Sequence, residues 1–549
     1  MSPNNPEGRA KNQAPDNQPP IQAPPRQLDP RFYYAALLLV ILLVAVIRFH
    51  LRTMPLERDE GEYAYAGQLI LQGIPPYALA YNMKLPGTYA AYAAIMAVFR
   101  QTTTGIRLGL LLINAATIVL VFLLAQKLAG SISGSLTGFV AATTYAVLSN
   151  LPSLLGFAGH ATHFVALFAL AGILVLLRAL NDRRGPLLFF CGGLLLGIAF
   201  LMKQPGIAFA AFGALYIARR SWKQPRLLAS REAAYLAGVA LPFALTCLAL
   251  ARAGVFHNFW FWTFTYAREY SSETSFAAGW QALQQSLQWA LHPFPLWAIA
   301  EIGLVTLFWD RCWRPQLFFL STLTVFSLLA VCAGFYFRPH YYILLLPAAS
   351  LLAGLAVTSA HRFLEQRRFP ASGRMVPVLL FIAACAFSLW DQRAFLFEFD
   401  PAAAGQKIYA ANPFAEAISA AKTVRATTTD TDTIAVFGSE PEIYFYSDRH
   451  SATGYIYMYD LIKTQPYQLQ MRQEMMRQIA AARPRIVIYV DDWASWGWRR
   501  GQEQDEFFTW MENYIHENYA PLQQIQINAL PAHRWGEAAN LYLFRRTAP

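Results

Sequence analysis

The densest set of chemically capable side chains lies in one short stretch, Glu57-Arg58-Asp59-Glu60-Gly61-Glu62-Tyr63. Asp59 is placed to cap a helix that continues to about Gln72. Because burial raises the pKa of a carboxyl, such a group can act as a general base toward a hydroxyl. The neighbouring carboxylate can hold a divalent metal or orient an acceptor. The alternative is an ordinary helix cap with solvated charges.

Three cations, Lys84, Lys203 and Arg338, stand near the ends of apolar runs. Lysine holds phosphate as a point charge, and arginine binds it through a forked pair of donors. Arg338 and His340 together suit a phosphate clamp. The alternatives are lysine side chains that extend toward water and an interfacial belt of polar and aromatic groups.

Two histidines, His160 and His163, are three residues apart in the stretch Gly159–His163. On a helix this spacing lets both side chains share one face, where they can bind a metal or a phosphate. The alternative is a structural pair of neutral, hydrogen-bonding imidazoles.

The sequence around these residues belongs to a membrane protein. Of its 549 residues, 56% are hydrophobic and only 14% are charged, whereas a soluble domain carries about 25% charged residues. Several apolar runs exceed the roughly 18 residues that cross a bilayer as a helix. The composition excludes an ordinary soluble enzyme and predicts a polytopic α-helical membrane protein.

We expect about eleven spans, near residues 32–49, 106–126, 133–150, 163–180, 187–202, 205–218, 232–252, 288–308, 316–334, 341–359 and 375–390. With eleven spans every basic cluster falls on one side, so the N-terminus is expected in the cytoplasm. This distribution also argues against a nucleic-acid partner. The stretch Thr88–Phe99 is short for a crossing and is expected to be juxtamembrane or re-entrant.

The predicted outer face collects residues 52–105, 151–162, 203–205, 254–287 and 335–342. These segments hold every candidate residue above except His163, which follows the second segment directly, so we expect the chemistry there. The aromatic stretch Phe256–Tyr270 suits an interfacial belt or carbohydrate stacking. Glu301, inside a span, is expected to face the bundle interior.

Three parts follow along the chain. Residues 1–30 are rich in Pro, Asn and Gln and predict a disordered cytoplasmic tail. Residues 31–390 form the membrane domain. Residues 391–549 predict a small extracytoplasmic α/β domain, with strands at Thr433–Gly438 and Arg485–Val490 and an amphipathic helix over Asp460–Ala482 between them.

Several stretches resemble a known family. RDEGEYAYAGQLILQGIPPY followed by KLPG resembles the first outer loop of GT-C membrane glycosyltransferases. The closer resemblance is to bacterial relatives of the dolichyl-phosphate-mannose protein mannosyltransferases and of the lipid A aminoarabinose transferase. The stretches GLLLGIAFLMKQPG, FRPHYYILLLPAASLLAG and IAVFGSEPEIYFYSDR also resemble that family. The resemblance covers most of residues 31–500.

The resemblance implies a hexosyl- or pentosyltransferase of the bacterial inner membrane. It would move a sugar from a polyprenyl-phosphate carrier to a protein, lipid A or envelope glycan on the non-cytoplasmic face. The residues that it assigns, or that we expect beside them, fall into three groups: Asp59 and Glu60 as catalytic residues; Lys84, Lys203, Arg338 and His340 on the donor phosphate; and Glu62, Tyr63, His160, His163 and Tyr341 against the substrate.

No nucleotide is needed with a lipid-linked donor, and a divalent metal is the one cofactor left open. Its candidate ligands are Asp59, Glu60, His160 and His163. Thr162 stands where close relatives often carry a carboxylate, which puts a metal site built from two acidic loops in doubt. The rival hypotheses are a polytopic lipid or sugar transporter and a non-catalytic envelope assembly protein.

Overall fold

The computed structural model describes residues 29–130, 133–180, 182, 185–410, 412–497, 505–527 and 539–547. The expected N-terminal tail, residues 1–30, lies almost wholly outside these ranges. A bundle of long apolar helices forms the larger part: α1 (Pro30–His50), α4 (Thr103–Ala129), α5 (Gly134–Leu148), α6 (Ala161–Ala179), α7 (Gly185–Met202), α8 (Ile207–Ser221), α9 (Pro225–Arg252), α13 (Pro295–Trp309), α14 (Leu317–Val331), α15 (Leu346–Gln366) and α17 (Val376–Asp391). Each predicted span overlaps one of these helices, which confirms a polytopic helical membrane protein.

Six of the described helices are long and apolar enough to cross a membrane by themselves. One further pair, α12 (Phe276–Ala290) and α13, passes the same test jointly but is bent by 113°. The break contains Pro293, and α13 begins at Pro295; proline has no backbone N–H to continue a helix. The predicted span at 288–308 therefore starts at Pro295, later than expected.

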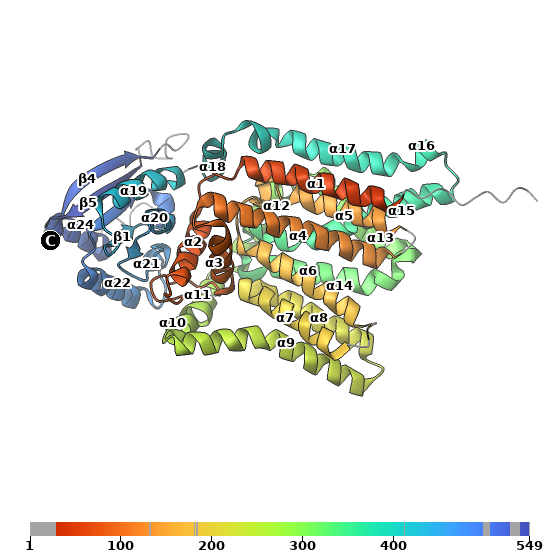
Figure 1. The fold of residues 1–549 in the computed structure, drawn as a ribbon, viewed down its shortest axis with the longest axis horizontal. Helices are drawn as coiled ribbons and strands as arrows, with labels where there is room; N and C mark the ends of the chain where they lie inside the picture. Colours follow the sequence, from red (N-terminus) through yellow and green to blue (C-terminus); the bar gives the residue numbers. More distant parts are fainter. Residues whose placement is uncertain are drawn as a thin grey trace, which may run out of the picture.

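Two shorter helices, α2 (Arg58–Leu71) and α3 (Gly87–Phe99), separate the bundle from the C-terminal domain. Figure 1 shows them side by side and running across the direction of the bundle helices. This arrangement agrees with the expectation that Thr88–Phe99 does not cross with the long helices. Ten consecutive residues of α2, from Glu60 to Leu69, are buried, so this helix is enclosed by protein.

The C-terminal part contains a five-stranded sheet of order β2-β1-β3-β5-β4. Strands β1, β2 and β3 are parallel, whereas β5 and β4 are antiparallel to their neighbours. The strands are β1 (Thr433–Phe437), β2 (His450–Ser451), β3 (Ile486–Asp491), β4 (Tyr519–Gln526) and β5 (Asn540–Arg546). The two strands expected from the sequence are β1 and β3, and the small α/β region is confirmed.

The helices of this part are α18 (Pro401–Tyr409), α19 (Phe414–Thr427), α20 (Glu442–Ser447), α21 (Tyr459–Ile462), α22 (Gln468–Ala482), α23 (Trp493–Trp496) and α24 (Glu506–Asn518). The single helix expected over Asp460–Ala482 is two helices, α21 and α22. Pro466 lies in the break between them, where its ring disfavours a continuous helix.

The structure refines one expectation about the remaining segments and contradicts another. The aromatic stretch forms α10 (Phe256–Trp260), a π-helical turn and α11 (Ala267–Ser272), and several of its rings are buried against the C-terminal domain. Trp262 stacks on Tyr81 with 5.6 Å between ring centroids, and Tyr266 donates a hydrogen bond to Asp460. Glu301 is exposed on α13 rather than turned into the bundle.

Candidate functional site

The site begins at the N-terminus of α2, where the cap is Glu57 and not Asp59. The Glu57 carboxylate accepts a hydrogen bond from the Glu60 backbone N–H at 3.0 Å, and the Glu60 carboxylate accepts one from the Glu57 N–H at 3.3 Å. This reciprocal pair is a capping box. The two glutamate side chains form the cap, and the Asp59 side chain, 27% exposed, takes no part in it.

Lys84 joins Asp59 to Glu62. Its ammonium nitrogen lies 2.7 Å from Asp59 Oδ1 and 2.6 Å from Glu62 Oε2, and 4.7 Å above the ring of Tyr63. Glu62 is fully buried and also accepts hydrogen bonds from two tyrosines, Tyr89 and Tyr457. Lys84 is therefore held by two carboxylates, and the Asp59–Lys84–Glu62 group is fixed from several sides.

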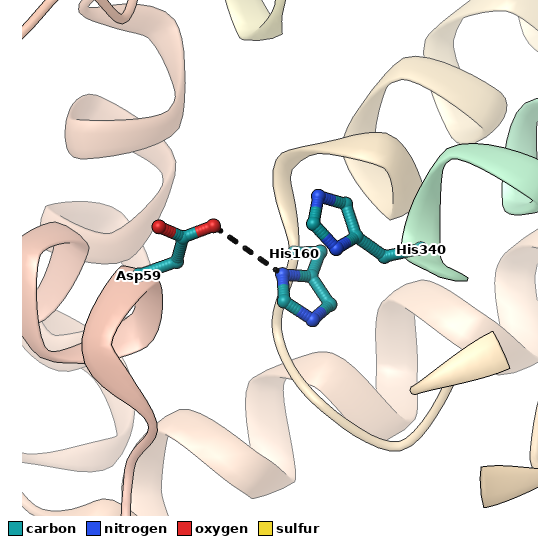
Figure 2. Close-up of side chains that lie close together, drawn as sticks. All are labelled: Asp59, His160 and His340. Carbon is teal, nitrogen blue, oxygen red and sulfur yellow. Dashed lines mark ion pairs between the residues drawn. The ribbon is translucent and has the colours of Figure 1, made fainter. Parts of the chain in front are cut away.

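Two imidazoles face Asp59 from separate elements, as Figure 2 shows. His160 is the residue before α6, and His340 belongs to a short 3-10 turn, Pro339–Leu344, before α15. Their rings stack with 3.9 Å between centroids and 14° between planes. His160 Nδ1 lies 3.9 Å from Asp59 Oδ2. Lys203 closes the group, with its ammonium 3.4 Å from His340 Nε2 and 4.1 Å above the Tyr341 ring.

Glu60 points the other way, into a fully buried ion pair with Arg107 of α4. Arg107 binds both carboxylate oxygens, and the Gly159 N–H also donates to Glu60. Since breaking a buried pair leaves an uncompensated charge, this contact ties α2 to α4 and to the residue before His160. The geometry gives Glu60 a positioning role, and a catalytic role for it stays a prediction.

The other candidates are spread around this centre. His163 is buried one turn into α6 and lies outside the group formed by Asp59, His160 and His340. Arg338 is exposed just before His340 and, among the described residues, makes no ion pair. Lys203 likewise has no carboxylate partner in the part of the chain that the structure describes. Because no carboxylate among the described residues neutralises Arg338 or Lys203, both side chains can bind an anionic ligand.

The charges at the site are set by burial and by neighbours. Burial raises the pKa of Asp59, but Lys84 and His160 lower it more, so the pKa lies well below its usual range. Asp59 is therefore ionised, contrary to the raised pKa expected from the sequence. Burial lowers the pKa of His160 to about 3 and that of His340 well below its usual range. Burial, with help from Lys84 and Arg338, lowers the pKa of Lys203 to about 7.

Asp59, His160 and His340 form a candidate metal site, because one ligand atom from each lies within 4.8 Å of the others. Two imidazoles and a carboxylate are a donor set that zinc accepts. However, the ammonium of Lys84 contacts Asp59 and that of Lys203 approaches His340. Two cations already face two of the three donors, so the arrangement opposes a further cation.

Several residues that hold the site were missed in the sequence. Arg107 lies within a predicted span, and a charged residue there is a signal for function. Glu440 pairs with Arg58 at 2.8 Å, and Tyr457 donates to Glu62 at 3.0 Å, both from the C-terminal domain. Nothing local in the sequence marks these two, because their partners are nearly 400 residues away.

This chain is similar in sequence and in fold to known proteins. Residues 84–251 match the sequence model of the family described as dolichyl-phosphate-mannose-protein mannosyltransferase. ArnT from Cupriavidus metallidurans bound to undecaprenyl phosphate superposes over 93% of this chain and 98% of its own, with TM-score 0.59 and 15% identity. The chain has a GT-C fold. With this fold and its long apolar helices, the chain is a multi-pass membrane protein.

A second solved GT-C structure is also similar. It is the Archaeoglobus fulgidus oligosaccharyltransferase tethered to an acceptor peptide, with TM-score 0.53 and 11% identity over 94% of this chain and 74% of the other. The archaeal oligosaccharyltransferase AglB with an inhibitory peptide and dolichol-phosphate gives TM-score 0.53 and 12% identity over 93% and 74%. No curated protein sequence matches this GT-C chain.

Proposed function

We propose that this GT-C protein transfers a sugar from a polyprenyl-phosphate carrier to an acceptor on the non-cytoplasmic face of a bacterial inner membrane. The observation that carries the proposal is that Asp59 and Lys203 meet around the stacked rings of His160 and His340. His160 Nδ1 lies 3.9 Å from Asp59 Oδ2, and the Lys203 ammonium lies 3.4 Å from His340 Nε2. A second cation, Arg338, lies two residues before His340. The fold supports the donor class, since solved structures with this fold hold undecaprenyl phosphate or dolichol-phosphate.

The reaction is a direct displacement at the anomeric carbon. The acceptor oxygen or nitrogen bonds to that carbon while the bond from the carbon to the phosphate oxygen breaks and its electron pair stays on the phosphate. The acceptor proton passes to Asp59. A carboxylate with a low pKa can take this proton because the attacking group becomes acidic only as its new bond forms.

The leaving phosphate carries the charge that develops in the transition state. Arg338 lacks a carboxylate partner among the described residues, so its charge is available to the phosphate. Lys203 also lacks one, and since its pKa is about 7, a bound phosphate would hold it in the charged form. Positive groups held beside the developing charge lower the barrier because they need no reorganisation during the reaction. Lys84, held by Asp59 and Glu62, instead fixes the orientation of the base. His160 and His340 are neutral and can hydrogen-bond the sugar or the phosphate.

The proposal does not name the sugar. A polyprenyl-linked hexose and pentose fit the same charge pattern, and a protein side chain, lipid A and an envelope glycan all offer acceptor groups. With one carboxylate beside the cations and one displacement, we expect the anomeric configuration to invert.

The test is transfer by the purified full-length protein. Wild type, Asp59→Asn and the control Asp430→Asn would receive radiolabelled polyprenyl-phosphate sugars and crude envelope acceptor. The Asp430 side chain is 94% exposed in the C-terminal domain. We expect wild type and the control to transfer label, and Asp59→Asn to lose about 10²–10⁴-fold, the usual worth of a general base. Equal transfer by Asp59→Asn would remove Asp59 from the reaction.

A further inference from the structure

A cavity of about 820 Å³ lies away from Asp59, between the membrane bundle and the C-terminal domain. Its walls come from the C-terminal end of α2, the turn between α3 and α4, and helices α19 and α20. Figure 1 shows these elements meeting beside the bundle. The volume falls in the range of small-molecule sites, about 300–1,000 Å³.

The cavity is separate from the proposed donor site. Gln68 lines it and lies nine residues after Asp59 on α2. At 100° and 1.5 Å per residue, nine residues make about two and a half turns and rise about 13 Å, so Asp59 and Gln68 lie on opposite sides of the helix. The cavity therefore opens from the opposite face of α2, and a ligand there does not compete with one beside Asp59.

Two arginines line the cavity from different domains. Arg100, between α3 and α4, makes no ion pair among the residues that the structure describes, and it is exposed. Arg425, on α19, lies 3.7 Å from Asp448, and its side chain is 61% exposed. One carboxylate for two guanidinium groups leaves a net positive charge. Guanidinium groups bind phosphate through forked hydrogen bonds.

The backbone at Arg100 is strained. Its φ of 73° and ψ of 157° fall in a region that glycine adopts freely and other residues rarely occupy. Gly105 lies close to the same turn, since a Cβ added there would overlap the carbonyl oxygens of Phe99 and Arg100. The strained turn places a guanidinium at the cavity, where a glycine would fit the backbone without strain.

The position along the bundle is that of lipid headgroups. Val98, two residues before Arg100, is 74% exposed, and the long apolar helix α4 begins at Thr103. Arginine beside the end of an apolar helix lies at headgroup level. The rest of the lining is mixed, with Leu71, Met96 and Phe445 among its apolar members.

We propose that this cavity binds the phosphate of an anionic ligand, held by Arg100 and Arg425. A phospholipid headgroup and a free phosphorylated sugar both present that chemistry. Tyr446 lines the cavity and accepts a hydrogen bond from the Leu56 N–H at 2.8 Å, one residue before the cap of α2. A ligand in the cavity therefore contacts the framework that holds the start of α2.

The test measures binding without any transfer reaction, so it is independent of the proposed function. Detergent-purified full-length protein would be examined by native mass spectrometry with phosphatidylglycerol or with diacylglycerol, which lacks the phosphate. In a second arm, glucose 6-phosphate and glucose would be titrated. The variant is Arg100→Gly with Arg425→Gln, and the control is Arg477→Gln on the exposed face of α22. Arg100→Gly suits the backbone, so the variant should fold.

We expect wild type and Arg477→Gln to prefer a phosphate-bearing probe to its neutral counterpart. The dissociation constant of that probe should be at least about tenfold higher for the double variant, because this is the usual effect of losing a charge-assisted hydrogen bond. A loss confined to phosphatidylglycerol identifies a lipid headgroup, and a loss confined to glucose 6-phosphate identifies a soluble ligand. Equal binding by wild type and the double variant to both probes overturns the proposal. Arg425→Gln alone, at an exposed side chain, repeats the comparison if the double variant is unstable.

Discussion

Arg58 and Glu440 form an ion pair of 2.8 Å that joins the residue before Asp59 to the C-terminal domain. Glu440 is fully buried, and Arg58 also reaches the Ser439 carbonyl and the Asn412 side chain. Because Asp59 follows Arg58 directly, the C-terminal domain takes part in fixing the start of α2. This domain is therefore expected to matter for transfer as well as for folding.

Removal of the Glu440 charge should destabilise the protein and reduce transfer. Glu440→Gln leaves Arg58 without its partner in a buried setting, which typically costs about 3–5 kcal/mol. The thermal midpoint of unfolding in detergent and the transfer rate are the measurements. Glu398→Gln is the control, since Glu398 pairs with Arg393 at 3.5 Å but is 59% exposed and should cost about 1 kcal/mol or less. Equal effects of the two substitutions would contradict this account.

Gly61 should tolerate no side chain. A Cβ added there would lie 2.6 Å from Glu442 Cβ and 2.7 Å from the Glu442 backbone nitrogen, so α2 and α20 would have to separate. We expect Gly61→Ala to cost about 1–3 kcal/mol, as for overpacking, and to lower the transfer rate. Gly185→Ala is the matched control, because its new Cβ meets nothing closer than 3.7 Å. A Gly61→Ala protein with a wild-type unfolding midpoint and rate would argue against this packing.

Glu60→Gln separates a positioning role from a catalytic one. The substitution leaves Arg107 with a neutral partner, and the buried arginine should lower stability by about 3 kcal/mol. The double substitution Glu60→Gln with Arg107→Met removes the unpaired charge, and we expect it to recover part of the lost stability. Unfolding midpoints of the three proteins give the coupling. A Glu60→Gln protein of full stability and no transfer would instead support a catalytic role.

Asp460 predicts a pH dependence of stability. Burial raises its pKa to about 6, although the hydrogen bond from Tyr266 lowers it. A carboxyl whose pKa is raised on folding stabilises the protein most at low pH, and the benefit is lost as pH rises from about 4 to 6. Between pH 4 and pH 6 the free energy of unfolding of the wild type should therefore fall by about 2 kcal/mol relative to that of Asp460→Asn. A constant difference would place the pKa at its ordinary value.

Transfer should not need an added metal. Lys84 and Lys203 already face Asp59 and His340, so a chelator is expected to leave the rate unchanged. The assay compares EDTA-treated and untreated protein, with zinc or manganese added back. Loss of transfer in EDTA and its return with one metal would show that the lysines give way to a cation.

The sequence by itself determined the elements and their order. Runs of apolar residues longer than a bilayer needs must form helices because unpaired backbone groups are costly in lipid. The buried strands β1 and β3 follow from short apolar runs bounded by polar turns. Short polar stretches between such runs are also visible in the sequence, and they carry Asp59, His160, Lys203 and His340.

Only the tertiary structure decided which of these side chains meet. Asp59 and Glu62 are three positions apart, so they share one side of α2 and meet at Lys84. Glu60 is turned by 100° from Asp59 and reaches Arg107 instead. His160 joins Asp59 while His163, one turn on, does not. The spacing of residues in the sequence predicts which side chains share a helix face. The residues that contact this face come from chain segments up to about 400 residues away, and only tertiary packing brings the two together.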